Sequence, residues 1–424
     1  MPVSTVPSAS RRHPLRWFAV GLVALAMLLG GCLTPTGQPP APRVYASMAA
    51  RAEAQVAVLD QVWSQIDRRF YDPAFNGADW ATARERYREA AAGAASEEEL
   101  YDVLNEMLEE LGDAHTVALT PLESWEDQQA QRAFVGVNIE RIEGQWIVVE
   151  LRPGGAAAEA GIQPGWIVVA RDGEPLSEAG VTFNNEPGQT YTWTFRDLEN
   201  RERDVALTAR TLPDWMPPAE WHAKEGWVYL RFDEFEPDYQ NWLRTRLRAN
   251  RKAPGIVLDL RQNAGGAVSS LERVITDFFP KRVAYGAFVS RKGRRDEERS
   301  AWLGGVGYEG ALVVLIGPGS ASSAEILAHV FKHYDRAVLV GRPTAGVVVA
   351  SQFFRLRDGG ELQIGTYDYE SMDGTRLEGN GVAPDIEVER TLADVRAGRD
   401  PDLDAAVDWL RATVRPAARE TTRH

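Results

Sequence analysis

The sequence predicts an α+β protein of several domains, and three observations support this fold class. The chain has 424 residues, enough for two or three domains, and its 44% hydrophobic and 25% charged residues are typical of a globular protein. Apolar residues first recur at helical spacing, short strand-like segments with turns follow, and strands then alternate with helices. We therefore expect a helical domain over residues 46–128, a β-rich module over 129–212, an α/β domain over 213–416 and a tail at 417–424.

The helical domain is predicted from a helix with one apolar face, followed by two shorter helices. The spacing predicts these two helices over residues 80–87 and 97–111, the second ending at Gly112. The apolar positions of the first helix are Val56, Leu59, Val62, Trp63 and Ile66.

The next two regions differ in their strand pattern. Strands over 134–139, 146–149, 165–170, 191–195 and 205–207 with short turns predict the small β-rich module. In the last region, apolar strands over 255–260 and 312–316 and helices over 238–250, 269–279, 321–334 and 401–414 predict a layered α/β domain.

Residues 1–31 have the features of a bacterial lipoprotein signal peptide. Three arginines precede the apolar run 17–29, which is too short to span a bilayer comfortably. The run ends at small residues before Cys32, the single cysteine of the chain, which excludes an intramolecular disulfide and predicts lipid attachment. Residues 32–45 are proline-rich and predict a tether. We expect a lipid-anchored protein that faces the periplasm of a bacterial cell envelope. Leu33 after the cysteine mildly favours the outer membrane, and a plain secretory signal is the alternative.

The charge of the chain argues against nucleic acid as a partner. The formal net charge is -14, and the body of the chain has no dense block of lysine and arginine. Binding to nucleic acid requires clustered cations that neutralise phosphates. We therefore expect no nucleic-acid partner.

Four segments could carry chemistry, and each by itself has an ordinary structural interpretation. Ser322 follows an apolar strand and begins a helix, but Ser322-x-x-Glu325 is also a helix capping box. The glycines at the end of segment 259–266 could bring N–H groups close to a reacting carbonyl, or form a plain turn. His115 lies in a loop, where a histidine is usually a hydrogen-bonded surface residue, and Glu378 lies in a glycine-rich turn, where a glutamate is usually solvated.

Together and in this order, the segments resemble the tail-specific (C-terminal processing) serine protease family. The resemblance starts near Trp63 and covers nearly the whole mature chain. It implies that residues 129–212 form a PDZ-like domain and that residues 213–416 form a crotonase-like ββα protease core. The matching segments are 70–72, 79–80, 111–116, 154–165, 259–266, 320–325 and 341–346.

The resemblance also indicates the catalytic subtype. Members with a serine and lysine dyad place the lysine where this chain has Val347, and no lysine follows Lys332. His115 and Glu378 instead occupy the positions of the base and its carboxylate in the tricorn-core-like subtype. The residue before the histidine is often a serine that helps to orient the site, and here it is Ala114.

The roles implied by this subtype are those of a catalytic triad. Ser322 is the expected nucleophile, His115 the general base and then acid, and Glu378 the carboxylate that orients the imidazole. The expected oxyanion hole consists of N–H groups from Ser323 and from Gly265 or Gly266. Ser320 is the alternative nucleophile, because it lies two residues earlier in the same turn.

Substrate selection is expected to depend on the PDZ-like module. Such modules bind an extended C-terminal peptide as an added strand. Phe134, Val135, Gly136 and Val137 form the expected carboxylate-binding loop, although they depart from the commoner Gly-x-Gly form. Trp166 also stands where an aspartate is usual. The resemblance implies peptide or protein tails as substrates and no cofactor.

His329 and His333 have the i,i+4 spacing of some metal ligands. No carboxylate or cysteine pattern accompanies them in the sequence. We expect these histidines to pack on the helix or face solvent, and we expect no metal.

Two other functions are compatible with the same residues. Ala114 and the atypical loop at Phe134 would suit a catalytically degenerate lipoprotein that binds peptides through its PDZ-like groove. A hydrolase of small esters could use the same serine, but the PDZ-like module makes this function less natural.

Overall fold

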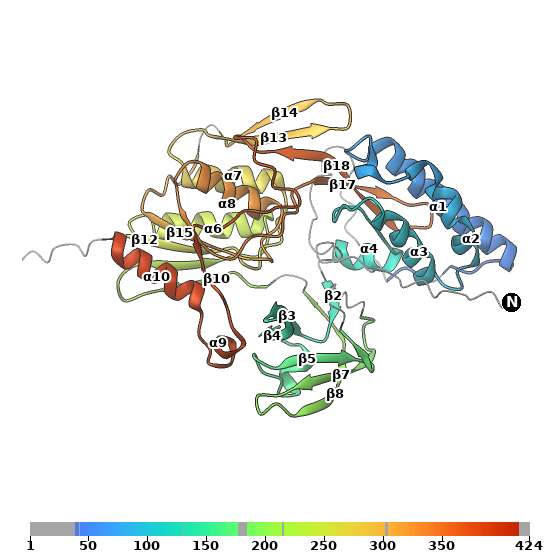
Figure 1. The fold of residues 1–424 in the computed structure, drawn as a ribbon, viewed down its shortest axis with the longest axis horizontal. Coiled ribbons are helices and arrows are strands. Elements are labelled where there is room, and N and C mark those ends of the chain that lie inside the picture. Colours follow the sequence, from blue (N-terminus) through green and yellow to red (C-terminus); the bar gives the residue numbers. More distant parts are fainter. Residues whose placement is uncertain are drawn as a thin grey trace, which may run out of the picture.

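A computed structural model describes residues 39–41, 43–129, 131–176, 185–213, 216–301 and 304–414. Its elements form a helical region, a small antiparallel sheet and a larger α/β body (Figure 1). The predicted signal peptide, Cys32, most of the tether and the predicted tail lie outside the described residues. No helix within the described part is both long and apolar enough to cross a membrane.

The amino-terminal region consists of helices whose ends the sequence specifies. Ser47 caps α1 (Met48–Arg69) and Ser96 caps α3 (Glu97–Glu109), because each hydroxyl accepts a hydrogen bond from a free N–H of the first turn. Between them lie the 3₁₀ turn η2 (Phe75–Gly77) and α2 (Trp80–Gly93). A fourth helix, α4 (Pro121–Gln128), follows after β1 (Val117–Leu119).

The helices do not form a separate core. Buried residues of α1, α2 and α3 pack against Leu362 and Ile364 of β18 (Glu361–Glu370). This strand belongs to a five-stranded sheet of order β1-β18-β13-β14, in which β17 (Ala350–Arg355) also pairs with β18. The other two strands are β13 (Ala284–Ser290) and β14 (Arg295–Arg299). The sheet therefore joins the helical region to the α/β body (Figure 1).

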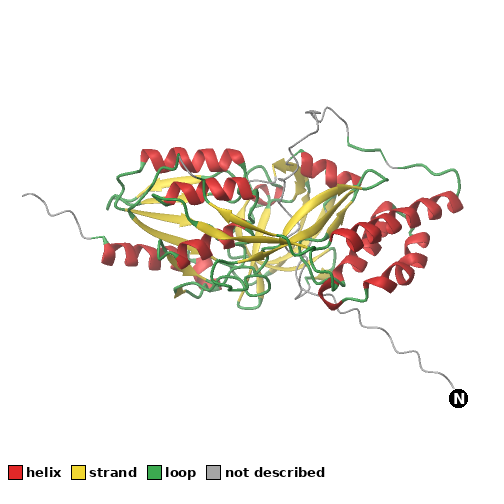
Figure 2. Cartoon of the chain, turned by 90° about the horizontal axis from the view of Figure 1, so that it is seen from above, coloured by secondary structure: helices red, strands yellow, loops and turns green. Residues whose placement is uncertain are grey.

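The α/β body is built on a six-stranded sheet of order β10-β11-β12-β15-β16-β19. All neighbours pair in parallel except the edge pair β10–β11. Helices α6, α7 and α8 cover one face, and α10 covers the other (Figure 2). The bounds are β10 (Ala219–His222), β11 (Val228–Arg231), α6 (Pro237–Ala249), β12 (Gly255–Asp259), α7 (Val268–Phe278), β15 (Ala311–Ile316), α8 (Ser323–His333), β16 (Val338–Gly341), β19 (Ile386–Glu387) and α10 (Pro401–Thr413).

The small sheet has the order β3-β4-β5-β7-β8, with β6 beside β5. Two-residue turns at Glu143-Gly144 and Asp172-Gly173 have positive φ at both positions, as tight hairpins require. Alternate side chains of β7 are buried, as expected for a sheet with one buried face. The bounds are β2 (Gln131–Phe134), β3 (Val137–Ile142), β4 (Gln145–Leu151), α5 (Ala156–Glu159), β5 (Ile167–Arg171), β6 (Glu174–Pro175), β7 (Thr190–Arg196), β8 (Glu202–Thr208) and β9 (Arg210–Pro213), of which β2 and β9 pair with each other.

Ion pairs and one apolar cluster connect the small sheet to the α/β body. Glu140 of β3 accepts from Arg390 at 2.8 Å and lies 3.5 Å from Arg342. Glu150 of β4 pairs with Arg231 at 3.0 Å. The helix α9 (Leu392–Arg396) also packs against apolar side chains of β3, β4 and β5. The small sheet is thus held at one end of the parallel sheet.

Candidate active site

Ser322 lies in the sharp turn between β15 and α8, at the carboxyl end of a buried parallel strand. Its backbone has φ 52° and ψ -118°, a conformation that a residue with a side chain rarely adopts. Hydrogen bonds hold it there: the N–H of Ser322 donates to the carbonyl of Val347 at 2.8 Å and to Oε2 of Glu325 at 3.1 Å. Such strain is concentrated at functional sites, where surrounding contacts maintain it.

The three serines of this turn differ in their surroundings. Ser320 is fully buried, and its hydroxyl donates to the carbonyl of Leu260 at 2.7 Å and accepts from the N–H of Gly317 at 3.1 Å. Ser323 is also buried, and its hydroxyl donates to the carbonyl of Gly266 at 2.8 Å. Ser322 is the most exposed of the three, at 8%. Ser320 and Ser323 thus have structural hydroxyls, and Ser322 is the serine best placed to react.

The two glycines after β12 lie directly beside this turn. A Cβ atom on Gly265 would lie 2.6 Å from Cβ of Ser322, so only glycine fits there. The N–H of Gly265 donates to Oδ1 of Asn263 at 2.9 Å, whereas no acceptor is found within the described residues for the N–H groups of Gly266 and Ser323. Gly266 and Ser323 therefore have the free N–H groups that an oxyanion hole requires.

His115 lies in the loop between α3 and β1 and is buried, with 1% of its surface exposed. Its Nδ1 has no hydrogen-bond partner in the described part of the chain and lies 3.9 Å from Oδ1 of Asp113. Within the described residues the ring makes no hydrogen bond to Ser322 or Glu378. Burial lowers the pKa of His115, opposed by the nearby Asp113. A neutral imidazole of this kind can accept a proton.

Asp113 fixes the conformation of this loop, a function that sequence reasoning missed. Its carboxylate accepts from the N–H of His115 at 3.2 Å and from the hydroxyl of Thr116. Thr116 Oγ1 in turn accepts from the N–H of Gly365 in β18 at 3.0 Å. The His115 loop is therefore attached to the strand that connects the helical region to the α/β body.

Glu378 lies in the loop that follows β18. Its Oε2 accepts from the N–H groups of Val348 and Val349 at 2.7 and 3.2 Å. Burial raises the pKa of Glu378 to about 7, and the negative charge of Asp113 adds to this effect. The carboxyl group is therefore poised to titrate near neutral pH.

Ser322 and Glu378 both bind the segment Val347–Val349, and the loop that carries His115 approaches it through Asp113. The carbonyl of Val347 accepts from the N–H of Ser322, and the next two N–H groups donate to Glu378. A Cβ on Gly365 would lie 2.8 Å from Val349 and 2.5 Å from Oδ2 of Asp113, so Val349 and the His115 loop both pack against this glycine. The segment therefore brings together three chain regions that are far apart in the sequence.

Glu325, the acidic residue of the capping-box pattern, binds the segment Thr344–Val347 as well as Ser322. It is fully buried, and its carboxylate accepts from the N–H groups of Gly346 and Val347 at 2.7 and 2.8 Å and from the hydroxyl of Thr344. The same carboxylate accepts from the N–H of Ser322. Glu325 thus holds segment 344–347 against the amino end of α8.

The predicted carboxylate-binding loop joins β2 to β3. The carbonyls of Val135 and Gly136 accept from the N–H groups of Ala157 and Arg152 at 2.9 and 3.0 Å. Gly136 has φ 95°, and a Cβ there would lie 2.6 Å from Cα of Gly155, so glycine is required. The guanidinium of Arg152 stacks on the ring of Phe134 at 4.2 Å. Since these carbonyls already have partners, the N–H groups are the part of the loop that could bind a carboxylate.

The chain is similar to known proteins over most of its length. Residues 226–388 match the profile of Peptidase family S41, and residues 52–109 match the Tricorn protease C1 domain. It is 27% identical over 407 residues to a carboxyl-terminal-processing protease of Synechocystis sp., covering 91% of this chain and 92% of that protein. It is 28% identical over 359 residues to carboxyl-terminal-processing peptidase 2, chloroplastic, of Arabidopsis thaliana, covering 78% of this chain and 68% of that protein.

Solved structures share the fold. The photosystem II D1 C-terminal processing protease superposes with a TM-score of 0.59 at 22% identity, covering 79% of this chain and 93% of that chain. The tricorn protease superposes with a TM-score of 0.52 at 20% identity, covering 86% of this chain and 37% of that chain. Ser322, Glu378 and both glycines lie within the S41 match, whereas His115 lies outside both matched ranges.

Proposed function

Because the chain belongs to the tail-specific family of carboxyl-terminal-processing serine peptidases, peptidase family S41, we propose that Ser322, His115 and Glu378 form its catalytic centre. We further propose that it cleaves peptides or proteins that it recognises by their C-terminal tails. The observation that supports the proposal is that Ser322 and Glu378 bind the same segment, Val347–Val349, which the loop of His115 approaches through Asp113.

The proposed reaction is acyl transfer to the serine. Ser322 Oγ attacks the scissile carbonyl carbon while the neutral His115 ring takes the hydroxyl proton, and the carbonyl oxygen becomes an oxyanion. The free N–H groups of Gly266 and Ser323 are the donors that would stabilise it. The intermediate collapses, and the leaving amine takes the proton from the imidazolium. Water then hydrolyses the ester bond to Ser322 in the same way.

Glu378 is proposed to orient His115 in the catalytic state. In the resting arrangement Asp113 is the carboxylate nearest to Nδ1, which has no hydrogen bond. Catalytic hydrogen bonds often tighten only when substrate is bound. Ala114 stands where a serine that helps to orient the site is often present, so this chain lacks that hydroxyl. Closure of the His115 loop on substrate would complete the relay.

Tail recognition is proposed for the small sheet, which would be a PDZ-like module on a crotonase-like ββα core. The loop Phe134–Val137 supports this proposal. Its two central carbonyls already accept backbone hydrogen bonds, and Gly136 packs closely against Gly155. N–H groups in such a loop could hold a substrate carboxylate, and an extended peptide would add as a strand. The ion pairs of Glu140 and Glu150 hold this module near the parallel sheet.

A lipid anchor is proposed from the sequence alone. The apolar run followed by Cys32 supports lipid attachment, and the proline-rich residues 32–45 would separate the enzyme from the membrane. The protein would then face the periplasm of a bacterial envelope, with the outer membrane mildly favoured. Mass spectrometry of the mature protein tests this proposal, because an unmodified Cys32 contradicts it.

A fluorophosphonate probe tests the catalytic centre. We expect wild type to be labelled and Ser322→Ala to lose labelling, while Ser320→Ala keeps it, because the hydroxyl of Ser320 is bonded within the fold. Absence of labelling in folded wild type would favour a protein that only binds peptides. Tail recognition is tested separately, because peptides with free and amidated C-termini should be cleaved at different rates. Equal rates would remove that part of the proposal.

A further inference from the structure

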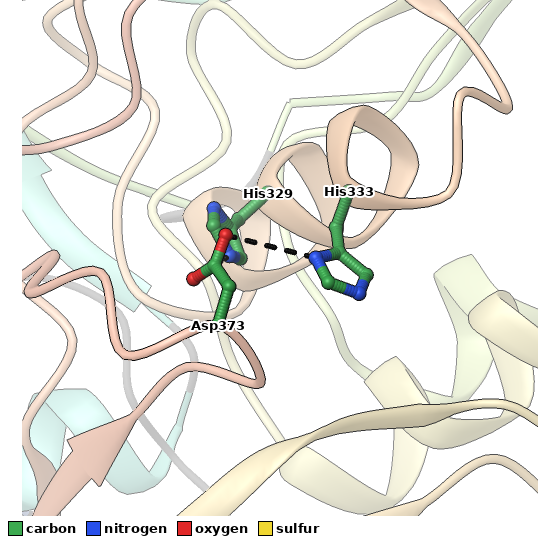
Figure 3. Close-up of side chains that lie close together, drawn as sticks. All are labelled: His329, His333 and Asp373. Atoms are coloured by element: carbon green, nitrogen blue, oxygen red, sulfur yellow. Dashed lines mark ion pairs between the residues drawn. The ribbon is translucent and has the colours of Figure 1, made fainter.

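Two histidines of α8 and one aspartate after β18 come together outside the proposed catalytic centre. His329 and His333 lie one turn apart on α8, and Asp373 faces both from the turn that follows β18 (Figure 3). His329 Nε2 lies 3.4 Å from Oδ1 of Asp373, and His333 Nδ1 lies 3.6 Å from Oδ2. One ligand atom from each residue lies within 4.8 Å of those of the other two.

The two distances from histidine to Asp373 exceed those of direct hydrogen bonds and lie close to the spacing of metal ligands, although each involves a different carboxylate oxygen. N–H···O bonds join atoms about 2.7–3.2 Å apart. Around a tetrahedral Zn²⁺ with bonds of about 2.0–2.1 Å, neighbouring ligand atoms are roughly 3.3–3.4 Å apart. Nε2 of His329 is also buried, in a residue that is only 6% exposed, and among the described residues it makes no direct hydrogen bond. The nitrogen and the Asp373 carboxylate thus face each other at ion-pair distance without one.

We propose that His329, His333 and Asp373 bind a divalent transition-metal ion such as Zn²⁺. Two imidazole nitrogens and one carboxylate oxygen are a ligand set that Zn²⁺ and related ions accept. The side chains of His333 and Asp373 are 31% and 39% exposed, so an ion can enter and keep a water molecule in a further position. The sequence indicated only the two histidines as possible ligands, because they are one helical turn apart. The fold brings Asp373 beside them as a third ligand.

The carboxylate is held in place for this role. Oδ1 of Asp373 accepts from Ser371 Oγ at 2.8 Å and from the N–H of Thr375 at 3.0 Å. A ligating carboxylate is commonly oriented by such hydrogen bonds from residues that do not touch the ion.

The position of this site indicates a structural effect of the ion. His329 lies seven residues after Ser322, roughly 10 Å along the axis of α8, so the ion would not touch the reacting atoms. Asp373 lies five residues before Glu378, in the turn that leads to it. A bound ion would fasten this turn to the helix that begins at Ser322. This inference is independent of the proposed peptidase mechanism, because its test measures metal uptake.

Isothermal titration of the full-length chain, first treated with a chelator, with Zn²⁺ tests the site. We expect one ion per chain, and an affinity that falls by about tenfold or more in His333→Ala and in Asp373→Asn. Asparagine keeps an oxygen for the bonds from Ser371 and Thr375, so the turn should remain folded. Hydrogen exchange in residues 371–378 should slow when Zn²⁺ is added to wild type and stay unchanged in His333→Ala.

His222→Ala is the matched control. His222 lies 3.1 Å from Glu220, its side chain is 56% exposed, and among the described residues no third ligand accompanies it. This variant should bind Zn²⁺ as wild type does. The proposal is overturned if wild type takes up no stoichiometric Zn²⁺, which would leave only a cluster of ion pairs. It is equally overturned if His333→Ala and His222→Ala bind the ion alike.

Discussion

Gly265→Ala provides a direct test of the geometry around Ser322. The new Cβ would lie 2.6 Å from Cβ of Ser322, 2.9 Å from the carbonyl oxygen of Ala321 and 3.1 Å from the N–H nitrogen of Ser323. Carbon atoms in contact lie about 3.5–4.0 Å apart, so the serine would have to move by roughly 1 Å. Misplacement by this distance costs about 10²-fold in rate, and displacement of an oxyanion donor costs about 10²–10³-fold.

The same substitution also affects stability, and a second variant separates the two effects. Gly265 has φ 101°, which disfavours alanine, and overpacking costs about 1–3 kcal/mol. Gly293→Ala is the control, because Gly293 has φ 73° in the turn between β13 and β14 and no atom within 4 Å of a Cβ there. Gly293→Ala therefore introduces the strain of alanine at positive φ but no contact with Ser322.

The assay compares the two variants at a temperature where calorimetry shows both to be folded. Rates of fluorophosphonate labelling and of peptide cleavage should fall by about 10² or more in Gly265→Ala and stay near wild type in Gly293→Ala. If folded Gly265→Ala reacts within about twofold of the control, then Ser322 is not the reacting group or does not lie against Gly265 as described.

Three further predictions concern other parts of the molecule. Ser320→Ala should lower the free energy of unfolding in urea by about 1–3 kcal/mol, because backbone groups lose their partner, and an unchanged midpoint would contradict this. Burial raises the pKa of Glu378 from 4.5 to about 7, so the folded state keeps a proton that the unfolded state has released. Stability should therefore fall by up to about 3 kcal/mol as the pH rises from about 4.5 to about 7. Glu378→Gln should remove this slope in urea unfolding measured across the pH range, and an identical slope in both proteins would refute the assignment. Glu140→Gln removes the charge that pairs with Arg342 and Arg390, so hydrogen exchange in residues 137–151 should quicken while the parallel sheet stays protected. Unchanged exchange in the small sheet would show that other contacts hold it in place.

The elements that the sequence predicted well are those with local signals. The strand β15 followed by Ser322 and α8 was expected from an apolar run and a helix-start pattern, and the structure has a strand to Ile316 and a helix from Ser323. The capping serines of α1 and α3 and the two tight turns of the small sheet were not predicted, although their signals are equally local. In each case a few neighbouring residues determine the conformation.

The sheet that joins the helical region to the α/β body was not predicted, because its signals are not local. β1 pairs with β18 through residues about 245 positions apart, such as Val117 and Gln363. β14 has the sequence RDEER, in which no apolar alternation indicates a strand. Only the completed fold shows that β18 carries the His115 loop, through the hydrogen bond between Thr116 and Gly365. The contact between Asp373 and His329 could not be predicted for the same reason, because the two residues are far apart in the sequence.

The site residues were named from a resemblance, and the structure adds the contacts between them. Sequence reasoning left open which glycine donates to an oxyanion, and the bond from Gly265 to Asn263 leaves Gly266 as the candidate. It assigned no role to Asp113, although this carboxylate is the nearest one to His115. Spacing cannot reveal such contacts, because they depend on how loops approach each other.

The contacts of Glu325 show that Ser322 can belong to a helix capping box and still be available as a nucleophile. As the third residue of α8, it accepts from the N–H of Ser322, which is what a capping box predicts. It also accepts from Gly346 and Val347, and the carbonyl of Val347 accepts from the same N–H of Ser322. The rare backbone conformation of Ser322 is therefore maintained from both sides by one carboxylate and the segment that this carboxylate holds. The helix cap is then part of what makes the serine available, so a pattern common to many helices acquires a specific function from the loop that packs against it.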